Sequence, residues 1–274
     1  MIRGFYTAAA GMIAQQRRQE MLTDNLANAT TPGYKKDDAS MRAFPNMLIQ
    51  AMGVDNRPFG KSHHVGELTT GAYLQERTVN FLQGDLSETS NTTDFALLQG
   101  NVPVNEETGR PGALFFTVEN GTGETRYSRN GNFAITGTGF LTTSEGFYVL
   151  DNAGARINVG NEDIQMTRDG LITNQAGEEI AVVNIALVSD PDLLVKEGNG
   201  LLRYEGELPV LTAIGNENVT YQLMQGFLEQ SNVDAAQTMT DMTMAFRSFE
   251  ANQKVLQAYD RSMEKAVNEI GRLG

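Results

Sequence analysis

The sequence predicts an α+β protein, with an all-β central domain of antiparallel, hairpin-rich strands between N- and C-terminal helices that form a coiled coil. Apolar residues recur at helical spacing at both ends of the 274-residue chain. In the middle, strand-like runs alternate with Asn-Gly and Asp-Gly turn signals. We expect residues 1–36 with 232–274 to form a terminal helical domain, residues 37–71 an extension that links it to the rest, and residues 72–231 the β-rich domain.

The first helix is predicted for residues 1–29. Alternate steps of three and four residues from Ile2 give a stripe that is apolar at its ends and polar in between: Phe5, Ala9, Met12, Gln16, Gln19, Thr23 and Leu26. Ile13 and Leu22 widen the apolar face, so the segment is an amphipathic helix. Pro32 disfavours a helical conformation at Thr31, and Gly33 can take a positive φ, so the helix ends before them.

The extension is expected to hold a short helix. Apolar residues recur at helical spacing between Met41 and Met52, and Pro45 is tolerated if it lies in the first turn. Residues 53–71 are expected to form a polar loop or an irregular segment.

From residue 72 the apolar period changes to two, which is typical of strands. The turn signals are Asn120-Gly121, Asn130-Gly131, Glu145-Gly146 and Asp169-Gly170. Sixteen of the 28 glycines lie between Gly100 and Gly206, where a meandering β-domain needs its turns. This part of the chain is therefore predicted to be all-β.

The second helix is predicted to run from residue 233 to residue 271. Alternate steps from Met239 give an almost unbroken apolar seam: Met242, Phe246, Phe249, Gln253, Leu256, Asp260, Met263, Val267 and Ile270. Ser231 is the expected N-cap, with Asp234 at the third helical position. About 40 residues would extend about 60 Å at 1.5 Å per residue. A seam of this length indicates a helical partner, because an isolated helix of this composition is marginal.

Charge and composition exclude several classes of function. The net charge is -13, and the acidity lies in the middle, because residues 1–36 carry five basic against two acidic residues and residues 234–274 carry five against six. An acidic body repels phosphate backbones, so nucleic acid is not an expected partner. The absence of cysteine excludes thiolate zinc sites and cysteine nucleophiles. No apolar stretch reaches the length of a membrane span, and no cleavable signal peptide is expected.

No catalytic, cofactor-binding or metal-binding residues are predicted. The chain has no phosphate-binding glycine loop, serine elbow or HExxH helix. His63-His64 lies in the extension without further ligands, and Asp37-Asp38 and Glu106-Glu107 are interpreted as solvated loop charges. We therefore expect a protein that is not an enzyme.

Several segments resemble signatures of one family. Tyr6-Thr-Ala-Ala-Ala-Gly-Met12 and Asn25-Leu-Ala-Asn-Ala-Thr-Thr-Pro-Gly-Tyr-Lys35 are similar to the N-terminal signature of the flagellar rod, hook and hook-associated axial proteins. Ser231-Asn-Val-Asp234 and Arg247-Ser-Phe-Glu-Ala-Asn252 resemble their C-terminal motif, and Tyr127-Ser-Arg-Asn-Gly-Asn-Phe133 resembles a β-domain segment of rod proteins. The chain length favours the distal rod type, similar to FlgG and FlgF and to the FlhO- and FlhP-like hook-basal body proteins.

The resemblance implies a structural subunit of the bacterial flagellar basal body. Its terminal helices would polymerise into the hollow axial tube of the distal rod, with the β-domain outside and residues 37–71 as a rod-type extension. The implied partners are other copies of the chain in a helical homopolymer, adjacent rod and hook proteins, and the flagellar type III export apparatus. The implied location is extracytoplasmic, where the rod crosses the periplasm or cell wall, without membrane insertion.

The resemblance and the apolar seams together predict the assembly interface. The N-terminal interface residues are Phe5, Ala9, Met12, Leu22, Asn25, Leu26, Asn28, Pro32, Gly33 and Tyr34. The C-terminal interface residues are Met239, Met242, Phe246, Phe249, Leu256, Met263, Val267 and Ile270.

Two alternatives remain open. The first is a hook or hook-associated junction subunit, which the sequence separates less well from a rod subunit. In the second, the acidic β-domain is a glycan-binding or hydrolytic domain, and the helices serve only for oligomerisation. The chain also departs from the rod pattern through an insertion between Gly100 and Phe115, which leaves the exact subtype undecided.

Overall fold

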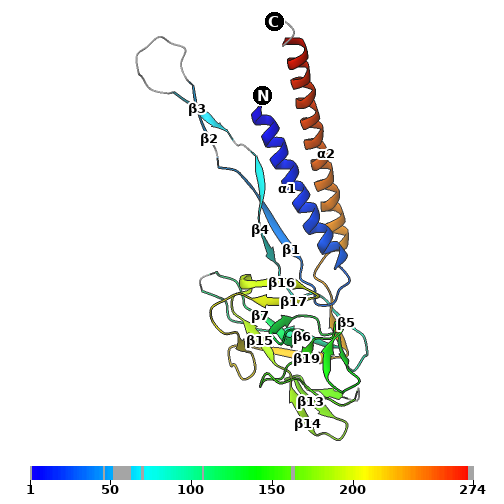
Figure 1. The fold of residues 1–274 in the computed structure, drawn as a ribbon. Helices are drawn as coiled ribbons and strands as arrows, with labels where there is room; N and C mark the ends of the chain where they lie inside the picture. The colour runs from blue at the N-terminus through cyan, green and yellow to red at the C-terminus, as the bar shows by residue number, and fades with distance from the viewer. Residues whose placement is uncertain are drawn as a thin grey trace. The chain divides into compact units, whose positions relative to one another are not determined.

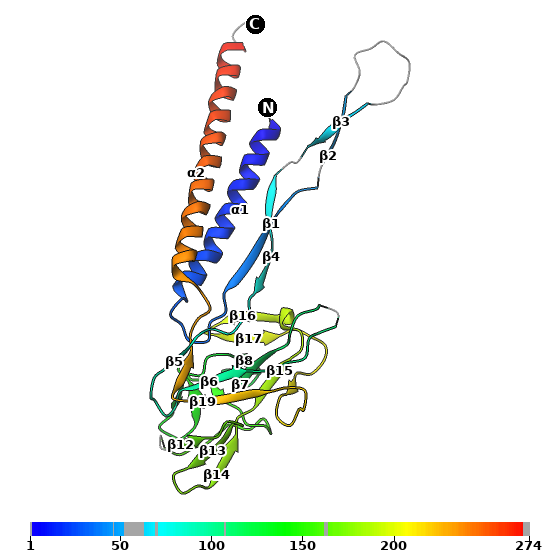
Figure 2. The same ribbon diagram turned by 180° about the vertical axis from the view of Figure 1, so that it is seen from behind.

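The computed structural model describes residues 2–45, 47–51, 63–68, 71–106, 108–161 and 164–270. The fold is mixed α and β, with mostly β structure in the central part of the chain, as predicted. The chain divides into two compact units. One unit comprises residues 1–26, 37–78 and 234–274, and the other comprises residues 27–36 and 79–233. Figure 1 and Figure 2 show the elements of each unit from opposite sides.

The first unit contains both long helices. Helix α1 spans Ile2–Ala27, and helix α2 spans Ala235–Lys265 and continues as a π-helix, η2, over Ala266–Ile270. The two helices run side by side in both views (Figures 1 and 2). The N-cap of α2 is Asp234, whose side chain accepts a hydrogen bond from the Gln237 amide at 3.0 Å, so the expected cap at Ser231 was wrong. Asp234 caps the helix because its carboxylate accepts a hydrogen bond from the amide three residues later in the chain.

The extension forms strands where a short helix was expected. Strand β1 (Asp37–Ala43) pairs with β4 (Ala72–Val79), and β2 (Met47–Ala51) pairs antiparallel with β3 (His63–Leu68). The predicted helix over residues 41–52 is therefore wrong. Pro45 disfavours a helical conformation at Phe44, whose amide instead bonds the Gly71 carbonyl at 2.9 Å. The predicted loop over residues 53–71 is corrected by β3, while residues 52–62 and 69–70 lie outside the described residues.

The second unit is built on one large sheet and several small ones. The nine-stranded sheet has the path β16-β17-β8-β7-β11-β10-β9, and β15 pairs with both β7 and β18. Its strands are Leu194–Gly198 (β16), Leu201–Tyr204 (β17), Thr125–Ser128 (β8), Ala113–Glu119 (β7), Tyr148–Val149 (β11), Leu141–Thr143 (β10), Phe133–Ile135 (β9), Ile185–Val188 (β15) and Leu211–Thr212 (β18). A short 3-10 helix, η1 (Pro191–Leu193), precedes β16.

Three smaller sheets complete this unit. One is the meander of β12 (Ile164–Met166), β13 (Leu171–Asn174) and β14 (Glu179–Val182). The others pair β6 (Phe95–Gln99) with β19 (Tyr221–Gln225), and β5 (Leu86–Glu88) with β20 (Phe227–Glu229). Every pairing with a stated register is antiparallel, so hairpins and meanders build this unit.

Three of the four predicted turns join paired strands. Asn120-Gly121 lies between β7 and β8, Glu145-Gly146 between β10 and β11, and Asp169-Gly170 between β12 and β13. Asn130-Gly131 differs, because it lies between β8 and β9, and these two strands occupy distant places in the sheet path. Asn120-Gly121 and Asn130-Gly131 carry the same dipeptide, so only long-range pairing distinguishes these two.

Strand β7 is buried on both of its faces. Leu114, Phe116 and Val118 point into the larger hydrophobic cluster, whereas Ala113 and Phe115 belong to a second cluster. In the larger cluster the Phe116 ring meets the Phe133 ring edge to face at 5.2 Å. A strand with two buried faces is nearly continuous in hydrophobic character, as the sequence of β7 is. Burying each of its large side chains contributes about 1.5–3 kcal/mol.

Gly131→Ala and Gly121→Ala form a matched pair of variants, because each glycine follows an asparagine. A Cβ at Gly131 would overlap the Phe95 carbonyl oxygen, whereas nothing lies within 4 Å of the corresponding position at Gly121. We expect Gly131→Ala to cost about 1–3 kcal/mol of unfolding free energy through overpacking. Gly121→Ala is expected to be neutral or slightly stabilising. Urea unfolding measures both, and equal effects would contradict the packing at Gly131.

Candidate assembly site

The two helices contact each other through small residues on α1. A Cβ added at Gly4 would overlap the Tyr259 hydroxyl, and one added at Gly11 would lie 3.0 Å from the Asn252 side chain. From Gly4 to Gly11 the residue number on α1 increases, while the contacting residue on α2 changes from Tyr259 to Asn252. The helices are therefore antiparallel. The absence of side chains at Gly4 and Gly11 gives room for the larger partners on α2.

The face of α2 that is shielded from solvent is offset from the predicted seam. Of the predicted seam, Met242, Phe249 and Leu256 lie on this face and are half-buried. At Met239, Phe246, Gln253 and Asp260, the preceding residue lies on it instead. The shielded residues are Thr238, Met242, Ala245, Phe249, Asn252, Leu256 and Tyr259. Alternate members of the predicted seam were therefore one residue away from the row that faces the fold. Sequence reasoning preferred the larger Met239 and Phe246 to the smaller Thr238 and Ala245.

The displaced seam residues form an exposed apolar row on α2. Met239 is 51% exposed, Phe246 52% and Val267 72%. Met263 continues the line of Met242, Phe249 and Leu256 seven residues further on and is 37% exposed. The side chain of Ile270, the last predicted interface residue, lies outside the described residues. Met239 and Phe246 are seven residues apart on a solvent-facing helix, a spacing typical of an interface with a further helix; the next two positions of the row are the polar Gln253 and Asp260, before Val267.

The predicted interface residues on α1 have mixed environments. Phe5, Ala9, Met12 and Leu26 are half-buried, and Leu22 is buried in a cluster with Met21, Ala245 and the partly buried Met242. By contrast, Tyr6 and Ile13 are 65% and 52% exposed. One face of α1 is covered by the strands, because a Cβ at Gly71 would lie 3.1 Å from the Ala10 Cβ.

Asn25 holds the end of α1 against the start of β1. Its side chain donates to the Asp37 carbonyl oxygen at 2.8 Å and accepts from the Asp37 amide at 2.9 Å. Arg77 on β4 pairs with Asp37 at 2.7 Å and with Asp24 at 3.1 Å. Asn25, predicted from the family signature as an interface residue, thus has a complete role within its own unit.

The rest of the N-terminal signature forms a turn in the second unit. Gly33 has φ +69, and a Cβ there would lie 2.5 Å from the Arg129 carbonyl carbon, so only glycine fits. Its amide donates to the Glu229 carbonyl oxygen at 2.8 Å. Pro32, Gly33, Tyr34 and Asn28 are half-buried, and the Lys196 ammonium lies 4.2 Å from the centre of the Tyr34 ring.

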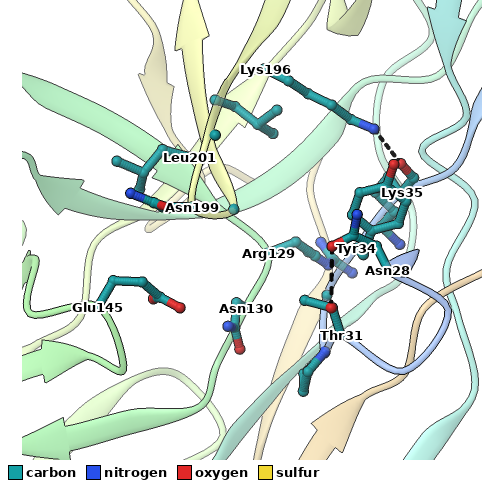
Figure 3. A pocket seen from close by; sticks show the side chains of 15 residues that line it. Asn28, Thr31, Tyr34, Lys35, Arg129, Asn130, Glu145, Lys196, Asn199 and Leu201 are labelled. Atoms are coloured by element: carbon teal, nitrogen blue, oxygen red, sulfur yellow. Dashed lines mark hydrogen bonds between the residues drawn. The ribbon is translucent and has the colours of Figure 1, made fainter. Parts of the chain in front are cut away.

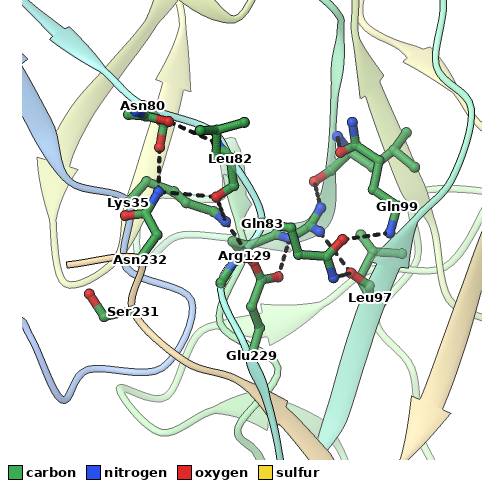
Figure 4. Close-up of polar contacts among 12 residues, drawn as sticks. Lys35, Asn80, Leu82, Gln83, Leu97, Gln99, Arg129, Glu229, Ser231 and Asn232 are labelled. Carbon is green, nitrogen blue, oxygen red and sulfur yellow. Dashed lines mark hydrogen bonds and ion pairs between the residues drawn. The ribbon is translucent and has the colours of Figure 1, made fainter. Parts of the chain in front are cut away.

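A buried ion cluster lies beneath this turn (Figure 4). Glu229 receives Lys35 Nζ at 2.5 Å on one carboxylate oxygen and Arg129 Nε at 2.6 Å on the other. All three side chains are at most 4% exposed. Arg129 also donates to the carbonyls of Leu114 and Leu97 at 2.5 and 2.7 Å. Glu229 thus pairs with both buried cations, and Arg129 also bonds two backbone carbonyls.

The cluster shifts the acidity of its members. Burial by itself would raise the pKa of Glu229, but Arg129 and Lys35 together hold it below its ordinary value. Burial lowers the pKa of Lys35, while Glu229 opposes this effect and Arg129 adds to it. Glu229 is therefore an ionised carboxylate at neutral pH.

Asn232 fastens three chain segments next to the cluster, as Figure 4 shows. Its side chain accepts from the Lys36 amide at 2.7 Å and donates to the carbonyls of Asn80 and Leu82 at 2.8 and 3.0 Å. We use the term clasp for Lys35, Arg129, Glu229 and Asn232. The clasp joins the segments that follow α1 and precede α2 to the strands of the second unit.

A cavity of about 190 Å³ lies over the signature turn (Figure 3). Its walls come from the turn, from Arg129 and Asn130, and from the connection between β16 and β17. Lys196 spans one side by donating to the Lys35 carbonyl oxygen at 2.7 Å. The Lys196 ammonium also lies over the Tyr34 ring, and Lys35 and Arg129 both pair with Glu229.

The described residues contain no group of three or more His, Asp or Glu side chains placed to hold a metal ion. Neither described helix is long and apolar enough to cross a membrane.

Comparison with known proteins places the chain in a family. Models of the flagella basal body rod protein, of the flagellar hook protein FlgE/F/G D1 domain and of the flagellar basal body rod FlgEFG protein C-terminal region match residues 5–35, 111–175 and 224–269. The flagellar hook-basal body complex protein FlhO of Bacillus subtilis strain 168 is 43% identical over 274 residues, which cover 100% of both chains. The chain belongs to the flagellar basal-body rod and hook protein family.

Further relatives include both rod and hook-basal body proteins. The flagellar basal-body rod protein FlgG of Agrobacterium fabrum is 31% identical, with 94% of this chain and 96% of the relative covered. The flagellar hook-basal body complex protein FlhP of Bacillus subtilis is 26% identical, with 96% and 97% covered. Membership of this family makes the chain a structural protein of the flagellar basal body, which serves motility.

Sequence reasoning missed the clasp of this rod-family chain. Lys35 and Arg129 were noticed only as members of motifs, and Glu229 was not singled out. Their charges are far apart in sequence, so no local pattern pairs them. One weak signal was available: Lys35 and Arg129 each lie in a motif made mostly of turn residues. A charge buried there needs a partner, because burying an unpaired charge is costly.

Removing the carboxylate of the clasp should destabilise the rod-family fold. Glu229→Gln leaves two buried cations without their counter-ion, so we expect a loss of about 3–5 kcal/mol in unfolding free energy. Glu205→Gln is the control, because its partner Arg203 is 46% exposed and such pairs contribute about 0–1 kcal/mol. Chemical denaturation followed by circular dichroism measures both variants. A loss at Glu229 no larger than at Glu205 would contradict the structural role of the cluster.

The clasp also predicts a pH dependence. Because the pKa of Glu229 is lowered in the folded state, its stabilisation is present above the ordinary carboxyl pKa and is lost as pH falls through the lowered value. The difference in unfolding free energy between wild type and Glu229→Gln should therefore be largest at neutral pH and shrink in acid. Urea titrations of both proteins across this range measure it, and a difference independent of pH would refute the assignment.

Proposed function

We propose that this chain is a structural subunit of the distal rod of the bacterial flagellum, polymerising through its terminal helices into a hollow axial tube. The observation that carries the proposal is the exposed apolar row of α2, on a helix already paired with α1. The family membership supplies the setting, and the row supplies a surface for contact with other copies. No catalytic role is proposed.

The length of α2 supports the same function. Gly4 of α1 faces Tyr259, so α2 continues beyond the start of α1 with residues that include Met263 and Val267. In the described part of the chain no helix lies beside α2 past the start of α1, and a second copy of the chain would provide a partner helix for these apolar side chains. Burying each would contribute up to about 1.5–3 kcal/mol. The terminal helices would thus gain much of their order from assembly, in line with the marginal stability of unsupported helices.

The proposed site of action is extracytoplasmic, where the rod crosses the periplasm or cell wall. Export through the flagellar type III apparatus suits a chain without cysteine. The proposed domain roles assign residues 1–36 and 232–274 to the tube, residues 37–71 to the rod-type extension and residues 72–231 to the outer surface. Adjacent rod and hook proteins are the proposed neighbours at the two ends of the polymer.

A hook or junction subunit is the second candidate. It is favoured by the names of two relatives, FlhO and FlhP, which are hook-basal body complex proteins. The two roles differ in position along one axis, so immunogold labelling of isolated hook-basal bodies separates them. Label within the rod supports the proposal, and label confined to the hook or its distal end replaces it with the alternative.

The double variant Met239→Ser/Phe246→Ser tests the assembly surface. Each side chain is about half exposed in the isolated chain, so folding should change little. Losing both contacts should cost on the order of 2 kcal/mol per interface, which raises the concentration needed for polymerisation at least about tenfold. Sedimentation and electron microscopy of the purified protein measure assembly, and swimming of a complemented deletion strain measures function.

Lys254→Gln is the matched control, since Lys254 is exposed on α2 and lies about 80° around the helix axis from Phe246. It should assemble and swim like wild type. Normal polymerisation and normal swimming of the serine double variant would overturn the proposed assembly surface. Circular dichroism of both variants confirms that a loss of assembly does not come from unfolding.

A further inference from the structure

The sequence contains three Asn-Gly pairs, at Asn120, Asn130 and Asn199. An asparagine before glycine is chemically labile, because the backbone nitrogen of the glycine meets little steric hindrance when it attacks the side-chain amide carbon. The reaction also requires that the asparagine side chain and the following backbone can move into line. The structure places the three pairs in very different surroundings, so their reactivities should differ.

Two of the pairs are restrained. The Asn120 side-chain oxygen accepts from the amides of Thr122 and Glu124 at 3.0 and 2.8 Å and from the Thr122 hydroxyl at 2.7 Å. The Asn130 side-chain oxygen accepts from the Asn132 amide at 3.0 Å. Gly131 is buried against Phe95, whose amide donates to the Gly131 carbonyl oxygen at 2.9 Å. Attack in either pair would require breaking these contacts.

The third pair is unrestrained. Asn199 is exposed in the connection between β16 and β17, and the described part of the chain gives its side chain no hydrogen-bond partner. It has φ 50, between Gly198 at φ 102 and Gly200 at φ 70. A non-glycine residue in this region is held at a cost of about 1–2 kcal/mol. Nothing lies within 4 Å of a Cβ added at either glycine, so the backbone has room to rotate.

We propose that Asn199 is a site of spontaneous covalent modification, at which the chain deamidates through a succinimide. The Gly200 nitrogen loses its proton to a solvent base and bonds to the Asn199 side-chain amide carbon. The bond from that carbon to the amide nitrogen breaks, and ammonia leaves. Water then opens the five-membered ring at one of its two carbonyls and yields aspartate or isoaspartate. No oxidant, reductant or cofactor takes part.

The modification would change the rim of the cavity. Asn199 lines it together with Glu145 and Lys196, as Figure 3 shows. The product adds a negative charge there, and the isoaspartyl form also lengthens the backbone of the turn by one carbon. Lys196 lies three residues before Asn199 and spans the cavity through its contacts with Tyr34 and the Lys35 carbonyl. The changed charge and backbone length would therefore lie next to Lys196 and alter the side of the cavity formed by this residue.

Timed incubation of the full-length protein at mildly alkaline pH tests the proposal. Peptide mapping by mass spectrometry follows the mass increase at each pair, and enzymatic methylation of isoaspartate identifies the rearranged product. We expect Asn199 to convert at least roughly tenfold faster than Asn120 and Asn130, a difference that corresponds to about 1.4 kcal/mol in activation free energy. Asn199→Ser should abolish the fast phase and leave the other two sites unchanged.

The same incubation in concentrated urea is the control, because all three pairs share the reactive dipeptide. Unfolding should bring the three rates together, which shows that the native difference comes from structure. The proposal is overturned if Asn120 or Asn130 converts as fast as Asn199 in the native protein. It is also overturned if Asn199 stays unmodified in the native state while the unfolded chain converts. Neither outcome bears on the flagellar role, which the assembly variants test separately.

Discussion

The ion cluster at Glu229 is the constraint on which the second unit depends. The carboxylate of Glu229 pairs with two buried cations, Lys35 and Arg129, from distant parts of the unit's sequence, and it also accepts the Gly84 amide at 3.0 Å. The low dielectric of the interior makes each of these contacts strong only while all of them are made. The cluster therefore selects one arrangement of four chain segments. Hydrophobic strands such as β7 supply stability, and Glu229 specifies how the segments around them are joined.

The sequence predicted most of the architecture because the relevant signals are local. Helices α1 and α2 follow from apolar spacing, and the predicted Asn-Gly, Glu-Gly and Asp-Gly turns account for the hairpins β7-β8, β10-β11 and β12-β13. The extension failed because its pattern is ambiguous. Residues 41–52 fit a helical period, yet β1 alternates between shielded and exposed side chains and pairs with β4, which lies beyond residue 71. A pairing at that separation leaves no trace in the local pattern.

The assembly site was predictable only in part. Alternate steps of three and four residues identify a helix correctly. They can still misplace every second residue of its buried face by one position. On α2 the larger side chains at Met239 and Phe246 drew the seam away from Thr238 and Ala245, which face the fold. Met239 and Phe246 are therefore not needed for packing within one molecule and remain exposed on its surface. In the second unit, the pairing of Lys35 with Glu229 spans 194 positions, and single-sequence patterns do not report such contacts.

The discontinuity of the first unit has a consequence for the order of events in folding. Its helices bring Gly4 to Tyr259, across nearly the whole chain, whereas most hairpins of the second unit close over a few residues. Closing so long a loop costs conformational entropy, and non-local contacts form slowly. The hairpins of the second unit can form while the chain is still emerging. The helical unit can form only after α2 has been made, because α2 supplies the helix that pairs with α1.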